Sequence, residues 1–245
     1  MTKIELQTEQ FKKFVQAITT ITTESFLNLD ETGMWVRAVD SPNYAMITAT
    51  IKRDKIEKYG FKKDAKPVKV AMNWSTISRI SKSIDYQSVI ELDFKEKELD
   101  FVGGDFHVIS PYPEIDTVIK EPNAVKLNSS TSFEFNGDKL HQIRGLNASE
   151  RFKLVAKPTL VELEGTGEND DTIAINLTNE YKGEPATALY GTDYLTAFGK
   201  VFVGSSVTVK FKTDHPISLS TNSHGVDIEY LLAPRIESKP EIEEN

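Results

Sequence analysis

Basic and hydroxyl side chains gather on one side of a predicted helix between Asn73 and Ile84. Asn73 is a natural N-cap, because its side chain can accept a hydrogen bond from a backbone N–H of the first turn. Arg79 and Lys82 fall on the polar side with Ser75, and no acidic residue interrupts that side. Such a face suits electrostatic contact with phosphate groups. The apolar stripe opposite it consists of Ile77, Ile80 and Ile84.

Three further segments have the same amphipathic build, namely Thr8–Ile21, Asp138–Leu146 and Thr192–Phe202. The four segments recur roughly every 60 residues, so the chain contains a fourfold internal repeat. Arg144 lies at the edge of its apolar stripe, which makes the third copy less regular. The basic and imidazole side chains that we expect to contact phosphates are Lys12, Lys13, Arg79, Lys82, Lys139, His141, Arg144 and Lys200.

The composition is that of a globular protein of one large or two ordinary domains. The chain has 245 residues, no cysteine and a net charge of −8, so disulfides and thiolate metal sites are excluded. Basic residues nevertheless outnumber acidic ones in the four helical segments, and a basic face on an acidic body is typical of a protein that touches nucleic acid with one surface. The alternative is that these lysines and arginines only solvate ordinary surface helices.

Membrane and secretory signals are missing from the sequence. No apolar run approaches the ~18–20 residues that span a bilayer, and the N-terminal MTKIELQTEQ has no apolar core of a signal peptide. We therefore expect a cytoplasmic protein with no membrane partner, associated with the nucleoid if archaeal, or a nuclear one if eukaryotic.

No constellation of residues indicates catalysis. His107, His141, His215 and His224 are widely spaced and form no metal-binding pattern. The glycines at Gly165–Gly167 lack the Lys-Ser/Thr of a phosphate loop, and paired acids such as Asp170-Asp171 lie in a polar turn. We expect neither an enzyme, nor a bound metal, nor a cofactor.

Between the helices the sequence alternates as β-strands do. Each quarter reads as a strand, a helix and then several antiparallel strands, which predicts an α+β fold of two similar domains, each made of two βαβββ-type repeats. The predicted strands are Ser25–Leu29, Met34–Ala38, Tyr44–Ile51, Ser88–Phe94, Glu98–Val102, Asp105–Ser110, Phe152–Ala156, Leu160–Glu164, Thr172–Leu177, Ala186–Tyr190, Ser206–Lys212, Ile217–Thr221 and Val226–Leu232.

A proline-containing stretch separates the two halves. We expect an N-terminal domain at 1–112, an extended connector at 113–128, a C-terminal domain at 129–237 and a disordered acidic tail at 238–245. Because each helix has a single apolar stripe, all four must lie on one face of a curved antiparallel sheet. If subunits close into a ring with the helices inside, the polar faces line a channel that would bind a duplex without reading its sequence.

Three motifs resemble the proliferating cell nuclear antigen family of sliding clamps, closest to its archaeal members. They are Val36-Arg37-Ala38-Val39-Asp40-Ser41, the Glu121-Pro122 step, and Tyr230-Leu231-Leu232-Ala233-Pro234-Arg235-Ile236-Glu237. The resemblance covers about residues 1–237 and implies the DNA clamp fold. It also implies a homotrimeric ring around double-stranded DNA that tethers DNA polymerase, flap endonuclease and DNA ligase and is loaded by a clamp loader. A heteromeric, checkpoint-type or virus-encoded ring with other partners is the alternative, and a ring-free β-rich binding protein is a third reading.

The resemblance further implies a pocket for short partner peptides that carry a glutamine and two aromatic residues. Tyr44 departs from the family because a smaller aliphatic residue is usual there, and Ala124 departs because a larger one is common, so the pocket is expected to be reshaped. Several of these apolar positions could instead be ordinary core residues. The matching residues are Val39, Asp40, Asn43, Tyr44, Pro122, Ala124, Val125, Leu127, Pro216, Leu231, Ala233, Pro234 and Ile236.

Subunits of such a ring are expected to join through the edge strands of their sheets. We predict one edge at Gly104–Ile109 and the other at Thr159–Glu164. The interface residues expected there are Phe106, His107, Val108, Ile109, Leu160, Val161, Glu162 and Leu163.

Overall fold

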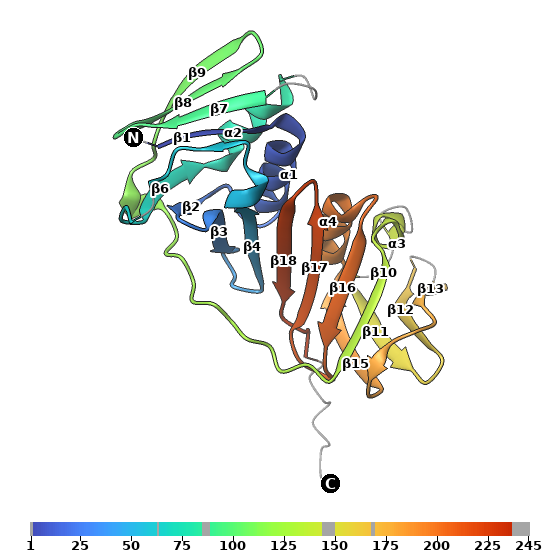
Figure 1. Cartoon of the computed structure of the whole chain (residues 1–245). Helices are drawn as coiled ribbons and strands as arrows, with labels where there is room; N and C mark the ends of the chain where they lie inside the picture. Colours follow the sequence, from blue (N-terminus) through green and yellow to red (C-terminus); the bar gives the residue numbers. More distant parts are fainter. Residues whose placement is uncertain (1, 63, 85–88, 144–149, 168–169, 237–245) are drawn as a thin grey trace.

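The computed structural model describes the chain except for residues 1, 63, 85–88, 144–149, 168–169 and 237–245. Within the described residues the strands form three sheets in which all pairing is antiparallel, with helices packed against them (Figure 1). The fold is therefore α+β, as predicted. The helices are α1 (Thr8–Thr19), α2 (Trp74–Lys82), α3 (Asp138–Gln142) and α4 (Thr192–Phe202), with short 3₁₀ turns at Arg53–Lys55 and Ile115–Thr117.

The largest sheet runs through both halves of the chain. Its strand order is β14-β10-β16-β17-β18-β4-β3-β2-β6. In that order the strands are Lys182–Gly183, Thr131–Asn136, Ser206–Phe211, Ile217–Ser223, Val226–Leu232, Ala45–Lys52, Gly33–Val39, Glu24–Asp30 and Val68–Asn73.

A smaller sheet lies at each end of the molecule. The N-terminal one has the order β5-β1-β7-β8-β9, with strands Lys58–Tyr59, Thr2–Gln7, Val89–Phe94, Glu98–Gly103 and Phe106–Pro111. The C-terminal one has the order β13-β12-β11-β15, with strands Thr172–Thr178, Leu160–Thr166, Arg151–Lys157 and Ala186–Gly191.

The fourfold repeat is visible as a strand that leads directly into each helix. The pairs are β1–α1, β6–α2, β10–α3 and β15–α4, and α1 and α4 lie behind the central sheet in Figure 1. The predicted cap of α2 is confirmed, because the Asn73 side chain accepts a hydrogen bond of 2.9 Å from the backbone N–H of Thr76. The predicted extension of α3 toward Leu146 falls outside the described residues.

The two halves are joined along the seam between β4 and β18, whose residues pair from Asp227↔Thr50 to Leu232↔Ala45. Tyr230 of β18 is fully buried at this seam, and its ring stacks on Phe198 of α4 with 4.2 Å between centroids. Its hydroxyl donates a 2.8 Å hydrogen bond to the carbonyl of Ala17 in α1. Burying such a side chain is worth about 1.5–3 kcal/mol, so this one residue of the closing motif ties a strand to helices of both halves.

The connector runs as an extended chain from the N-terminal half, below β2, β3 and β4 in the view of Figure 1, to the start of β10. Glu121 attaches it to the N-terminal half through Lys69 Nζ at 2.7 Å, Asn28 Nδ2 at 3.1 Å and Arg37 Nη1 at 4.0 Å. Because these partners lie on β6, β2 and β3, a single carboxylate fastens the connector to three neighbouring strands.

Candidate nucleic-acid and partner-binding surfaces

The exposed cations of the helices lie where the amphipathic pattern predicts them. Arg79 and Lys82 of α2, His141 of α3 and Lys200 of α4 are exposed. They remain accessible because the apolar stripe of each helix packs against the sheets, so the opposite side is turned away from the core.

Two further helix lysines are half-buried and donate to backbone carbonyls of neighbouring elements. The ammonium group of Lys12 lies 2.5 Å from the carbonyl oxygen of Ile84, and that of Lys139 lies 2.8 Å from Asn176 O and 2.9 Å from Leu177 O. Both contribute positive charge to the helix-bearing side while their geometry is held by the protein itself. Arg144 lies outside the described residues.

The prediction that the Lys13 side chain is exposed on the polar face of α1 is wrong. It is only 9% exposed, and its ammonium group donates to the carbonyl of Val201 near the end of α4. The cause is the neighbouring helix: α4 packs beside α1 across the seam and covers this flank, as the bond from Gln16 Nε2 to Lys200 O (3.3 Å) also shows. Burial lowers the pKa of Lys13 below the usual lysine value.

A hollow of about 550 Å³ opens where the loop after β3 meets the end of β18 and the start of α4. It brings together the predicted residues Tyr44, Ala233, Pro234 and Ile236, of which Tyr44 and Ile236 are 60% and 86% exposed. Its wall also includes residues that the sequence analysis did not assign to the pocket, namely Arg151, Gly191, Tyr194, Leu232 and Arg235.

The loop at the mouth of the hollow is fixed by Asp40. One carboxylate oxygen accepts a 2.9 Å bond from the backbone N–H of Ala45, and the other accepts the hydroxyl of Tyr194. The backbone of Tyr44 is held from the other side, since its carbonyl accepts a 2.8 Å bond from Ala233 N–H. Asp40 thus supports the hollow from beneath, without lining it.

The other predicted pocket residues do not line this hollow. Leu231 is only 7% exposed, but it points to the face of β18 opposite to Tyr230 and Leu232, which belong to the hydrophobic core. Val125, on the connector, is 54% exposed, and Asn43 has a left-handed backbone (φ 60°) that asparagine tolerates well. The remaining ones are half-buried or exposed, namely Val39, Pro122, Ala124, Leu127 and Pro216.

One predicted sheet edge is confirmed and the other is wrong. β9 is the last strand of its sheet and presents Phe106 and Ile109, which are 44% and 51% exposed, together with exposed His107 and half-buried Val108. β12, with Leu160, Val161, Glu162 and Leu163, is an interior strand, because β13 pairs along its outer side from Val161↔Thr178 to Thr166↔Thr172. The free edge at this end is therefore β13.

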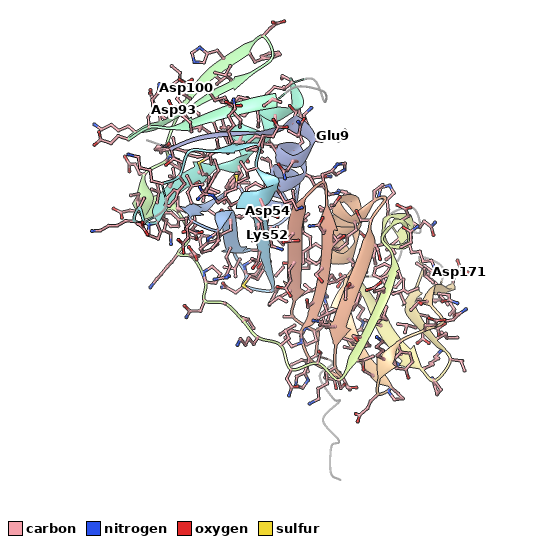
Figure 2. All side chains as sticks on the ribbon, in the orientation of Figure 1. Glu9, Lys52, Asp54, Asp93, Asp100 and Asp171 are labelled. Carbon is pink, nitrogen blue, oxygen red and sulfur yellow. The ribbon has the colours of Figure 1, made fainter. Side chains whose placement is uncertain are left out.

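Charges next to the β9 edge are paired within the chain. Asp100 on β8 (Figure 2) lies 3.0 Å from Lys95 Nζ and 2.5 Å from His107 Nε2. Hydrogen bonds from Lys95 and His107 lower the pKa of Asp100. The Asp100 carboxylate next to this edge is thus kept ionised, and its hydrogen-bonding partners are residues of the same chain.

Neither a metal-binding cluster nor a membrane-spanning helix occurs among the described residues. No cluster of three or more His, Asp or Glu side chains there could hold a metal ion. None of the described helices is long and apolar enough to span a membrane.

Comparison with known proteins gives a consistent result over nearly the whole chain. Residues 1–103 match the family described as proliferating cell nuclear antigen, N-terminal domain. The DNA polymerase sliding clamp of Methanospirillum hungatei is 29% identical over 248 residues, covering 97% of this chain and 100% of that one. The sliding clamp of Archaeoglobus fulgidus is 28% identical, with coverage of 94% and 97%.

Solved structures agree with these relatives. The A. fulgidus proliferating cell nuclear antigen bound to the C-terminal region of FEN-1 has a TM-score of 0.89 at 26% identity, covering 98% of this chain and 100% of that one. The antigen from Entamoeba histolytica shares the fold, with a TM-score of 0.85 at 14% identity and coverage of 96% and 99%.

Among the described residues, four repeated helices pack on three antiparallel sheets, and the two smaller sheets end in the free strands β9 and β13. This arrangement defines the sliding-clamp class of fold. Over nearly its whole length the chain is similar to sliding clamps of the proliferating cell nuclear antigen family, and residues 1–103 match the N-terminal domain of that family.

Proposed function

We propose that this protein is a DNA sliding clamp and polymerase processivity factor that encircles double-stranded DNA as a trimeric ring. The observation that carries the proposal is the placement of Arg79, Lys82 and Lys200 on the polar sides of helices whose apolar sides face the sheets. Phosphates recur about every 1.7 Å along a duplex axis, so mobile cations can hold DNA without fixing its register, which permits sliding.

The ring itself is supported by the two free edges. β9 and β13 are the free edge strands of the two smaller sheets, which lie at opposite ends of the molecule. Copies can therefore join head to tail by pairing the β9 edge of one with the β13 edge of the next. The exposed Phe106 and Ile109 would become covered in that arrangement. The same edges fit a heteromeric ring with sister chains, which is the second candidate.

The hollow beside Tyr44 supports the tethering part of the proposal. It combines an apolar wall with polar backbone and phenol groups, which is the usual form of a peptide-docking site. The A. fulgidus relative was solved with a FEN-1 peptide. By this reasoning the partners are DNA polymerase, clamp loader, flap endonuclease and DNA ligase, each through a short motif, and the role is non-catalytic. Because the proposed function takes place on DNA, the protein would be located at the nucleoid of an archaeal cell or in a eukaryotic nucleus.

Primer extension tests this function. With an archaeal replicative polymerase and clamp loader on a primed circle, the protein should lengthen the products made per binding event. The double variant Arg79→Glu/Lys82→Glu should lose that effect, because reversed charges repel phosphates. Lys153→Glu/Lys210→Glu is the matched control, since both lysines are exposed on strands away from the helix faces. Unchanged product lengths with the wild-type protein would contradict the proposal.

A further inference from the structure

Tyr194 joins the two halves of the chain at the base of the partner hollow. It lies in the first turn of α4, and its hydroxyl donates to a carboxylate oxygen of Asp40 at the end of β3. Its ring also lines the hollow that Tyr44 lines from the opposite half. One phenol therefore contacts both the hollow and the loop that shapes it.

Asp40 is the hub of that loop. It is 8% exposed, its backbone N–H donates to Ala45 O (3.0 Å), and its carbonyl accepts from Asn43 N–H (3.1 Å). With the 2.9 Å bond from Ala45 N–H to its carboxylate, three bonds close the turn from Asp40 to Ala45. The orientation of this turn decides where the exposed ring of Tyr44 stands.

The phenol of Tyr194 acts as a donor at any ordinary pH. Burial, together with the hydrogen bond to Asp40, raises its pKa to about 12. A buried carboxylate that loses such a donor is still desolvated but no longer compensated by the hydrogen bond. Rotation of the carboxylate toward water then becomes favourable and displaces the loop.

We infer that Tyr194 is a positioning residue for partner peptides: by holding Asp40 it fixes the 41–44 loop, and with it Tyr44, in the orientation that receives an aromatic-bearing peptide. The inference rests on the proposed peptide-binding role of the hollow. Its physical basis is preorganisation, because a loop that is ordered before binding does not have to be ordered by the peptide.

Fluorescence anisotropy with a labelled peptide from the C-terminal region of FEN-1 tests the inference. Tyr194→Phe removes one oxygen and should weaken binding roughly five- to tenfold, the loss expected for the net contribution of one ordinary hydrogen bond. Tyr59→Phe is the matched control, because that phenol also donates to protein oxygens, Asp30 O at 2.9 Å and Gly33 O at 2.6 Å, but lies outside the hollow. It should lower thermal stability to a similar degree and leave peptide affinity unchanged.

A double-mutant cycle separates positioning from direct contact. If Tyr194 acts through the loop, Tyr194→Phe should have little further effect in a Tyr44→Ala background, since the ring that it positions is gone. Additive effects would show that Tyr194 contacts the peptide by itself and would overturn the inference. Equal affinity of wild type and Tyr194→Phe would overturn it as well, with the hollow still a peptide site. A wild-type protein that binds no such peptide would instead overturn the proposed docking site and this inference with it.

Discussion

At the residue scale, Lys13 places an ammonium group where charge is poorly solvated. Its side chain lies between α1 and α4, and its bond to the Val201 carbonyl ties two helices of different halves. A carbonyl near the end of a helix is a suitable acceptor for a cation, because the last carbonyls of a helix have no intrahelical partner. Lys13 is better understood as a seam residue than as a phosphate contact.

The pH dependence of stability tests this assignment of Lys13. Its pKa is lowered in the folded chain, so between that pKa and the ordinary value of 10.5 the unfolded state binds the extra proton. Stability from this group therefore rises with pH across that window. Lys13→Met should unfold within about 1 kcal/mol of wild type at pH 7. In urea titrations, the free energy of unfolding of the wild type minus that of the variant should become more positive as the pH approaches 10.5. A flat difference between pH 7 and 10 would show that the ammonium is well solvated.

Sequence periodicity could place cations on a helix but could not show what covers the helix. The wheel of α1 puts Lys12, Lys13 and Gln16 together, and only the packing of α4, far away in sequence, separates the buried Lys13 from its neighbours. Tyr194 and Arg151 were not predicted as pocket residues for the same reason. No local sequence pattern indicates that α4 and β11 contact the loop after β3.

At the element scale, the β9 edge carries an apolar surface that a partner strand would cover. Ile109→Lys places a charge on this edge and should shift the protein to monomer, because a desolvated ammonium would oppose strand addition. The fold should survive, since Ile109 is 51% exposed. Val89→Lys is the control: Val89 is 42% exposed but lies on β7, an interior strand. Sedimentation velocity should show a monomer for the first variant and an unchanged assembly for the second, and equal masses for both would count against β9 as an interface.

The connector depends on Glu121 for its attachment to the sheet. Glu121→Ala removes the contacts with Lys69, Asn28 and Arg37, so the connector should be cleaved several-fold faster by thermolysin while the rest of the chain stays folded. Lys126→Ala, an exposed connector residue, is the control and should be cleaved at the wild-type rate. Equal cleavage of both variants would mean that the connector is held by other contacts.

Strand and helix positions were largely predictable because each element has a clear period and a turn or cap at its ends. Sheet order was not. The mistaken edge at β12 arose because Leu160–Leu163 alternate as an edge or an interior strand would, and only the register of β13 decides between the two. The pairing of β4 with β18 was likewise not predicted: a curved sheet under all four helices was expected, but no local pattern shows which strands join residues on either side of the connector.

At the scale of the whole molecule, the proposed function uses distinct surfaces of the chain for three kinds of partner. The polar faces of the helices suit duplex DNA, the free edges β9 and β13 suit further copies, and the hollow beside Tyr44 suits partner peptides. Their separation allows one ring to hold DNA and tethered enzymes at the same time. The ring is the condition for both activities, because a single open chain cannot enclose a duplex.

The solution mass tests the ring most directly. Multi-angle light scattering across a dilution series that starts below micromolar concentration should give three times the 27.5 kDa of one chain at every dilution. That result would establish that this chain closes a ring by itself. A mass of one chain that persists at every concentration would contradict the homotrimer.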